Sequence, residues 1–251
     1  MSDLASLFGM SGETSVESDR SGYSALPSDI YDATVKYVYM DATSNGTQFI
    51  KVVLDVKGKT IESDNLWIIN KETKKPYKVG NDGKPVYTYG WQVFNSLAIV
   101  ASGGIDGSKL NLEKKIISKY DYAAGKDMPV EVACFTELTG KQIKVGLKEL
   151  NKHSKVKMPD GTWKPSTKTK LVNTVDKYYT TDGKTAAEFV SGKDAEYGSK
   201  WLASYKNQTF EEALKEEPVE VPESGNDAMS ALMNNGSSKV TQASDILFGD
   251  D

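Results

Sequence analysis

The chain of 251 residues is long enough for one large domain with insertions and short for two full domains. Its hydrophobic fraction of 38% predicts a folded core, whereas a single cysteine, Cys134, and a single histidine, His153, exclude internal disulfides and zinc sites built from several such residues. No apolar run approaches the roughly 18 residues that a membrane helix needs, and residues 1–20 lack a signal-peptide pattern, so we expect a cytoplasmic protein.

Charge is divided unevenly along the chain, although the net charge is only −4. Residues 30–210 hold 28 Lys against 20 acidic residues, and residues 211–251 hold 2 Lys against 10. Residues 1–29 are acidic and contain Arg20, the only arginine of the chain. Because polar and acidic composition at the two ends is typical of disorder, we predict a flexible acidic arm (1–29), a basic domain (30–210) and a disordered acidic tail (211–251).

Alternating apolar side chains predict strands at Tyr31–Met40 and Gln48–Val56, with a turn at Ser44-Asn45-Gly46 between them. A third strand is predicted over Thr60–Asn70, after a turn at Lys57-Gly58. Connections this short join antiparallel neighbours. The first part of the domain is therefore expected to be a three-stranded meander.

The middle of the domain predicts a polar insertion, a helix and a hairpin. Residues 71–90 centre on Asn81-Asp82-Gly83, a strong turn signal, and indicate a β-finger. Trp91–Ala101 has apolar residues at mainly helical spacing and is followed by a Ser-Gly-Gly stop. Strands at Met128–Leu138 and Lys141–Leu150 are then expected to pair across the Thr-Gly sequence between them.

The order of three strands, a helix and two strands is that of a five-stranded OB-type barrel. A further hairpin is predicted over Ser154–Asn173, turning at Pro159-Asp160-Gly161, and short helices are predicted at Thr185–Phe189 and Ala195–Tyr205. The expected fold class is therefore mainly β, an OB-type barrel with β-hairpin insertions, short helices and a disordered acidic C-terminal tail.

Lysines are concentrated in residues 141–170, which hold nine Lys and two acidic residues. On the predicted strand, Lys144 and Lys148 share the face opposite the apolar Val145, so we expect that face to be positive and turned outward. Phosphate groups are the expected counterpart. The alternative is an ordinary solvated lysine surface.

Aromatic residues alternate with lysines in both predicted insertions, and rings that stack on bases beside lysines that neutralise phosphates favour single strands over duplexes. The alternative for Tyr87 and Tyr89 is packing in the barrel wall. Phe135 is expected to be either a stacking platform or covered by a flanking element. The candidate DNA-binding residues are Lys74, Lys75, Tyr77, Lys78, Tyr87, Tyr89, Phe135, Lys144, Lys148, Lys155, Lys157, Trp163 and Lys164.

Signatures of catalysis are weak in this sequence. Gly58-Lys59-Thr60 and Gly183-Lys184-Thr185 are similar to the end of a phosphate-binding loop, but Val53 and Tyr178 stand where its first glycine belongs. His153 has no nucleophile nearby in the sequence, and the carboxylates show no pairing pattern. We therefore expect no enzymatic activity, no cofactor and no metal.

In layout, residues 30–251 resemble the single-stranded-DNA-binding replication proteins of tailed bacteriophages. The resemblance rests on the order of strands, helix and hairpin, on the Lys and aromatic insertions, and on an acidic tail that ends in apolar and acidic residues. It implies sequence-independent binding and protection of single-stranded DNA during replication, recombination or repair, in the host cytoplasm. Near absence of arginine agrees with this mode, because bidentate reading of bases relies chiefly on that residue.

The resemblance also implies that the tail competes with DNA and recruits a polymerase, helicase or primase. The candidate partner-binding residues are Asp245, Ile246, Leu247, Phe248, Asp250 and Asp251. Tails of that family often end in an aromatic residue, whereas three residues follow Phe248 here. The alternative is a phage structural or carbohydrate-binding β-protein, which has little use for a basic domain joined to an acidic tail. The sequence leaves the oligomeric state open.

Overall fold

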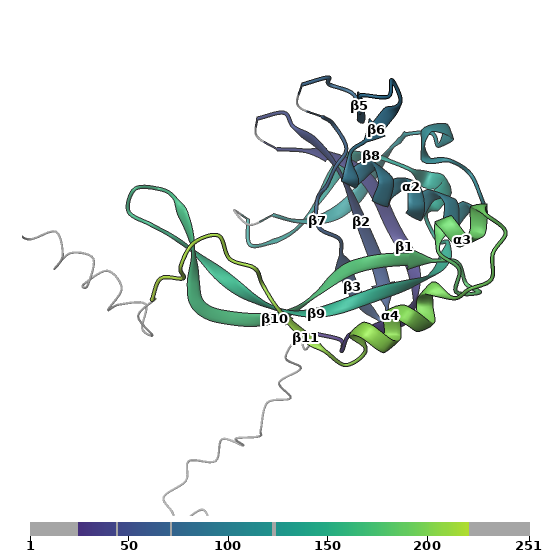
Figure 1. Ribbon diagram of the computed structural model, residues 1–251. Coiled ribbons are helices and arrows are strands. Elements are labelled where there is room, and N and C mark those ends of the chain that lie inside the picture. Colours follow the sequence, from purple (N-terminus) through teal and green to yellow (C-terminus); the bar gives the residue numbers. More distant parts are fainter. Residues whose placement is uncertain (1–24, 44, 71, 122–123, 221–251) are drawn as a thin grey trace, which may run out of the picture.

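The computed structural model describes residues 25–220, apart from residues 44, 71 and 122–123. Strands dominate this part of the chain, which confirms the predicted mainly β class, and one long hairpin projects from the body of the molecule (Figure 1). None of the described helices is long and apolar enough to cross a membrane.

Strand β1 (Asp29–Ala42) is the centre of the main sheet. One of its edges pairs antiparallel with β2 (Gln48–Val56), and the first half of its other edge pairs antiparallel with β9 (Gln142–Lys157). The sheet continues from β2 to β3 (Lys59–Glu62) and from β9 to β10 (Trp163–Tyr179). The β1–β2 hairpin confirms the first two predicted strands.

The predicted third strand is divided into β3 and β4 (Leu66–Trp67). Between them the chain leaves the sheet at Ser63, whose hydroxyl accepts a hydrogen bond from the Val52 amide at 3.1 Å. Strand β4 then returns to β2, where Trp67 lies opposite Phe49 and their ring centroids are 5.2 Å apart. This break places the Trp67 ring at the surface with 44% of the residue exposed.

Helix α2 (Tyr89–Ser102) confirms the predicted helix and closes the core on one side. It begins at Thr88, whose side chain accepts from the Trp91 amide, and ends at Gly103, which has the left-handed φ of 76° that favours glycine. Phe94 and Leu97 are fully buried against the sheet. The strand residues of this core include Val35, Ile50, Leu54, Val145 and Leu147.

The predicted pairing of Met128–Leu138 with Lys141–Leu150 is wrong. Strand β8 (Lys126–Cys134) pairs instead with β7 (Glu113–Asp121), a strand that we did not predict, and its end meets β1 at Tyr39. The expected Thr-Gly turn crosses over to β1, because the Gly140 amide donates to the Val35 carbonyl at 2.8 Å. Strands β8 and β9 therefore lie along different halves of the same edge of β1.

Both predicted insertions are hairpins. The finger consists of β5 (Tyr77–Val79) and β6 (Pro85–Tyr87), with Gly83 in its turn at φ 76°. The long hairpin consists of β9 and β10 and turns at residues 159–161, where the Met158 amide donates to the Thr162 carbonyl at 2.8 Å. It is longer than predicted, because the same two strands begin in the main sheet.

Short elements complete the described chain. Helices α3 (Ala186–Val190) and α4 (Tyr197–Tyr205) confirm the two predicted short helices, and single turns of 3₁₀ helix cover Gly107–Lys109 and Thr136–Leu138. Strand β11 (Thr209–Glu211) then runs parallel to β9.

The described ends of the predicted arm and tail pack on the β9–β10 hairpin. The Leu26 amide donates to Asn173 Oδ1 at 2.8 Å, and Asn173 Nδ2 donates back to the Leu26 carbonyl at 2.7 Å. Near the other end, the Val219 amide donates to the Pro165 carbonyl at 2.9 Å. The described fold therefore includes residues 25–29 and 211–220. Residues 1–24 and 221–251, which contain the predicted partner-binding residues Asp245, Ile246, Leu247, Phe248, Asp250 and Asp251, lie outside the described residues.

Candidate nucleic-acid interface

The finger carries exposed lysines over a chain of aromatic contacts. Lys74, Lys75 and Lys78 are exposed, as predicted. The ring centroids of Tyr77 and Tyr87 are 5.6 Å apart, and Tyr87 stacks on Trp91 of α2 with an interplanar angle of 22°. Tyr87 remains 41% exposed, so a face of this stack is open to a ligand while the other side ties the finger to the helix.

Phe135 belongs to the core, and its predicted role as a stacking platform is wrong. Only 6% of the residue is exposed, and its ring centroid lies 4.7 Å from that of Phe94 on α2. The covering element is the helix, which packs where the chain passes from β8 toward β9. Phe135 therefore stabilises the fold and is not accessible to a base.

The outward positive face predicted for Lys144 and Lys148 is also wrong, because Lys148 packs beneath helix α4 and both lysines are paired with carboxylates. Lys148 forms an ion pair with Asp176 at 2.8 Å, and its ammonium group lies 3.9 Å from the centroid of the Tyr205 ring. The Trp201 indole donates to the other oxygen of Asp176 at 2.7 Å. Lys144 forms an ion pair with Asp32 at 2.6 Å.

Gly146 allows this cover to form. A Cβ atom at residue 146 would lie 3.2 Å from the Trp201 ring, so a side chain here would press on the indole. Trp201 itself is 1% exposed. The sheet end of β9 is thus a packing surface for α4 around Gly146 and Lys148, whereas Lys144 keeps 33% of its side chain exposed.

The distal end of the same hairpin presents the predicted lysines and a ring to solvent. Trp163 is 63% exposed and lies directly opposite Lys157 across the two strands. Lys155 lies two residues along β9 from Lys157, which puts it on the same face. Lys155, Lys157 and Trp163 form a basic and aromatic surface that we call the hairpin tip, whereas Lys164 pairs with Val156 and lies on the other face of the hairpin.

An acidic segment, residues 211–220, runs beside the hairpin. Glu212 accepts a hydrogen bond from the His153 amide at 2.9 Å, and Glu211 accepts from the Asn151 side chain at 3.2 Å. His153 lies within this contact, with Nδ1 2.7 Å from the Ser166 carbonyl. The histidine therefore has a structural environment, and acidic side chains lie next to the lysine-bearing strands.

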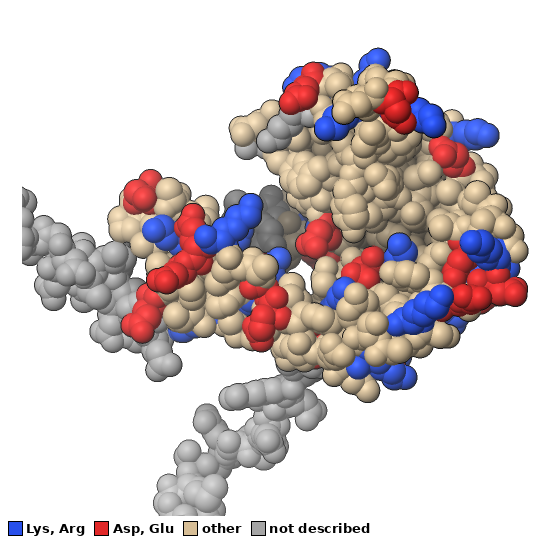
Figure 2. Space-filling model, in the orientation of Figure 1, with Lys and Arg blue, Asp and Glu red and all other residues tan. Residues whose placement is uncertain are grey.

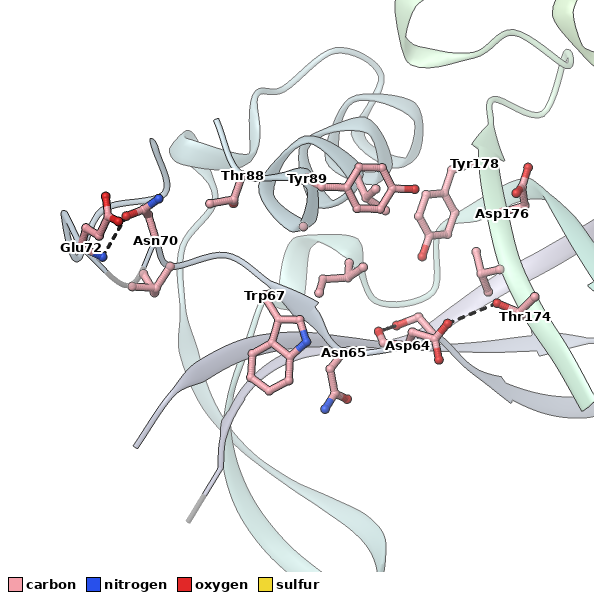
Figure 3. Close-up of a pocket in the computed structure, with 16 residues that line it drawn as sticks. Asp64, Asn65, Trp67, Asn70, Glu72, Thr88, Tyr89, Thr174, Asp176 and Tyr178 are labelled. Atoms are coloured by element: carbon pink, nitrogen blue, oxygen red, sulfur yellow. Dashed lines mark hydrogen bonds between the residues drawn. The ribbon is translucent and has the colours of Figure 1, made fainter. Parts of the chain in front are cut away.

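A groove of about 700 Å³ opens between β4, the start of α2 and β10 (Figure 3). Tyr89, which is 77% exposed, presents its ring to the groove, whereas Trp67 lines it where its backbone meets α2 and turns its ring toward Phe49 (Figure 3). Gly90 sets the distance between two of its walls, since a Cβ atom there would lie 2.4 Å from the Trp67 carbonyl oxygen. Of the predicted DNA-binding residues, Tyr89 is the one in this groove.

Two smaller hollows share lining residues with the groove. One shares Tyr89 and Tyr178 with it and adds Lys177, while the other shares Ile69 and adds Lys74 beside the β1–β2 turn. Figure 2 shows a broad uncharged surface on the upper part of the molecule, with acidic residues as well as lysines between it and the strands below. The groove thus connects the finger side of the molecule to the hairpin side.

The centre of the groove is acidic. Its sixteen lining residues include Asp64, Glu72 and Asp176, and no lysine among the described residues lines it. The charge of Asp176 is offset by Lys148, whereas Asp64 is exposed and accepts a 3.3 Å hydrogen bond from the Thr174 hydroxyl. This arrangement disfavours phosphate in the centre and suits groups that donate hydrogen bonds.

Tyr178 forms part of the groove wall, although only 2% of the residue is exposed. Its hydroxyl has no hydrogen-bond partner in the described structure. Burial is the main cause that raises the pKa of Tyr178, and the nearby Tyr89 and Asp64 raise it further, so the hydroxyl stays protonated. The sequence analysis did not predict Asp64, Trp67 or Tyr178 as site residues. Asp64 and Trp67 fell within a predicted strand, and Tyr178 was considered only as the residue that replaces the first glycine of a phosphate-binding loop.

Neither the protein-family models nor the curated proteins compared with the chain gave a match. Within the described residues, no cluster of His, Cys, Asp and Glu could hold a metal ion.

Proposed function

We propose that this protein binds and protects single-stranded DNA during phage replication, recombination or repair, without sequence-specific recognition and without catalysis. The observation that carries the proposal is the pairing of exposed rings with exposed lysines, of which Trp163 opposite Lys157 is the clearest case. Such rings stack on bases of any type, and lysines neutralise the backbone. The groove with Trp67 and Tyr89 extends this surface toward the finger.

We also propose an OB-type barrel as the architecture. Support comes from the order β3-β2-β1-β9-β10 with α2 between β3 and β9 in the chain. Strands β3 and β10 approach each other, and the Thr174 hydroxyl donates to Asp64 across the gap. OB folds bind oligonucleotides with the loops after their first and fourth strands, which here are the β1–β2 turn and the β9–β10 hairpin.

The acidic tail is proposed to compete with DNA and to recruit a polymerase, helicase or primase through residues 245–251. Support for competition comes from residues 211–220, whose carboxylates already contact the hairpin at Asn151 and His153. The tether is short, so the effective concentration of the tail near the hairpin is on the order of millimolar. Net tail charge also repels DNA from the adjacent lysines.

Titration of tryptophan fluorescence with oligo-dT tests the proposal, because Trp67 and Trp163 are exposed at the proposed surface. We expect quenching and an affinity that falls with salt at a log-log slope of about −0.7 per phosphate contacted. Truncation after Glu220 and after Phe210 should raise affinity in two steps, more at low salt, where charges are least screened. Absence of binding at low salt would refute the proposed function.

A carbohydrate-binding protein is the second candidate, favoured by the aromatic and acidic lining of the groove around Trp67, Asp64 and Tyr89. Titration with neutral oligosaccharides under the same conditions separates the two. Sugar binding that shows no dependence on salt, without oligo-dT binding, would select this candidate.

A further inference from the structure

We propose that the centre of the groove accepts one unstacked nucleobase with an exocyclic amine against Asp64 and the Tyr178 hydroxyl, so that the protein prefers cytosine to thymine at this position. This inference rests on the proposed binding of single-stranded DNA. It adds a base preference at one position to an otherwise unselective surface.

The shape of the groove suits a flat ring. Tyr89 on α2 presents an aromatic ring from one wall and the backbone of Trp67 on β4 forms another, while Figure 3 places Tyr178 and Asp64 beyond Tyr89 on the β10 side. The backbone of Trp67 is held against the helix by Gly90, so these walls form without a ligand. A base that leaves the strand here meets the Tyr89 ring first and polar groups behind it.

Charge argues that a base, and not a phosphate, occupies the centre. Within the described residues no lysine lines this part of the groove, whereas Lys74 and Lys177 line the two smaller hollows that share residues with it. The Asp64 carboxylate would repel a phosphate in the same place. The strand can therefore keep its backbone near these lysines while one base points inward.

The unpartnered Tyr178 hydroxyl is an independent indication of a ligand. A buried hydroxyl without a partner is unfavourable, and no described group satisfies this one. A hydroxyl that stays protonated can donate to a ring nitrogen while Asp64 accepts from the neighbouring amine. Cytosine carries this pair as N3 and its exocyclic amine.

Thymine matches the same groups less well. Its N3–H is recessed between two carbonyl oxygens, so a carboxylate that approaches it is repelled on both sides. The exocyclic amine of cytosine projects beyond the ring, and acceptance from this amine by Asp or Glu is an established mode of base recognition. The difference predicts a preference that depends on Asp64.

The test compares oligo-dC with oligo-dT of equal length by fluorescence titration at pH 8, for the full chain and three variants. We expect the full chain to bind oligo-dC about tenfold more tightly. In Asp64→Asn and Tyr178→Phe the ratio should fall toward one. Because Tyr178 loses no hydrogen bond in the free protein, Tyr178→Phe should leave the melting temperature unchanged or raised.

Glu62→Gln is the matched control. Glu62 lies two residues from Asp64, is exposed, forms an ion pair with Lys51 and does not line the groove. Glu62→Gln should keep the ratio near tenfold, whereas Asp64→Asn should lose affinity for oligo-dC until it approaches that for oligo-dT. Equal affinity of the full chain for the two oligonucleotides, or the same ratio in all variants, overturns this inference and leaves the proposed function standing. Failure to bind either oligonucleotide overturns both.

Discussion

The two ends of the β9–β10 hairpin use the same residue types for different purposes. At the sheet end, Lys148 lies beneath α4 in contact with Asp176 and Tyr205. At the tip, Lys157 lies opposite Trp163, which is 63% exposed. A lysine and an aromatic ring on neighbouring strands can therefore be either a packing unit or a binding surface, and the element that covers the strand decides between them.

Whether another element covers an aromatic ring determines its contribution to stability as well as its accessibility to a ligand. Trp201 is fully enclosed and donates to Asp176, so its ring contributes apolar burial together with a hydrogen bond to a charged group. Trp163 contributes little to burial and keeps its faces free. Paired substitutions at the two ends should therefore separate stability from binding.

The largest effect is expected from Trp201→Ala. Removal of this ring leaves a cavity against Gly146 and an unpaired oxygen on Asp176, so the free energy of unfolding should fall by about 3–5 kcal/mol, measured by urea denaturation. Trp163→Ala is the matched control and should change this free energy by less than about 0.5 kcal/mol. Equal losses in both variants would contradict the contrast between the two ends.

Lys148→Ala should have the next largest effect. It leaves the half-buried Asp176 without its cation and removes the contact with Tyr205. We expect the free energy of unfolding to fall by about 1.5–3 kcal/mol in thermal or urea denaturation. Affinity for oligo-dT should stay unchanged, and a loss of affinity in a fully folded Lys148→Ala protein would return this lysine to the binding surface.

Trp163→Ala should weaken oligo-dT binding by about 1–3 kcal/mol, the value of one stacked base. Fluorescence anisotropy of a labelled oligonucleotide measures this change without relying on the protein tryptophans. Trp163→Phe retains a ring and should recover part of the affinity. If both variants bind like the unmodified protein, the hairpin tip is not a stacking site.

The smallest effect is expected from the tip lysines. Lys155→Ala and Lys157→Ala should each reduce the slope of log affinity against log salt by about 0.7, with a small loss of affinity at moderate salt. Lys148→Ala serves as the control, because its ammonium group is covered and should leave the slope unchanged. If the salt slope is also unchanged in Lys155→Ala and Lys157→Ala, the phosphates contact other parts of the protein.

Local sequence signals predicted the elements that depend on nearby residues. Gly83 and Gly161 adopt positive φ in the turns of the two predicted hairpins, and Thr88 and Gly103 delimit the predicted helix. These features follow from backbone sterics and capping within a few residues. The exposed tip around Trp163 could be predicted for the same reason, since both strands of the hairpin are continuous in sequence.

Long-range pairing and cover could not be predicted in this way. Strand β7 has a strongly polar sequence and is defined by its partner β8, and Gly140 bonds to Val35, which lies more than a hundred residues earlier in the chain. Lys148 was predicted to face solvent, because the alternation of apolar residues identifies the two faces of a strand but does not show which element packs on each face. The groove residues Asp64 and Tyr178 come together only when β10 returns beside β3.

Gly90 gives the groove a mechanical property. With no side chain between them, the first turn of α2 and the backbone of Trp67 touch, and the helix continues through Trp91 and Phe94 into the core. A ligand that pushes the backbone of Trp67 toward α2 must therefore move the helix, which is packed into the core through Phe94. The distance between these two walls of the groove is therefore fixed, and it depends on residue 90 having no Cβ atom.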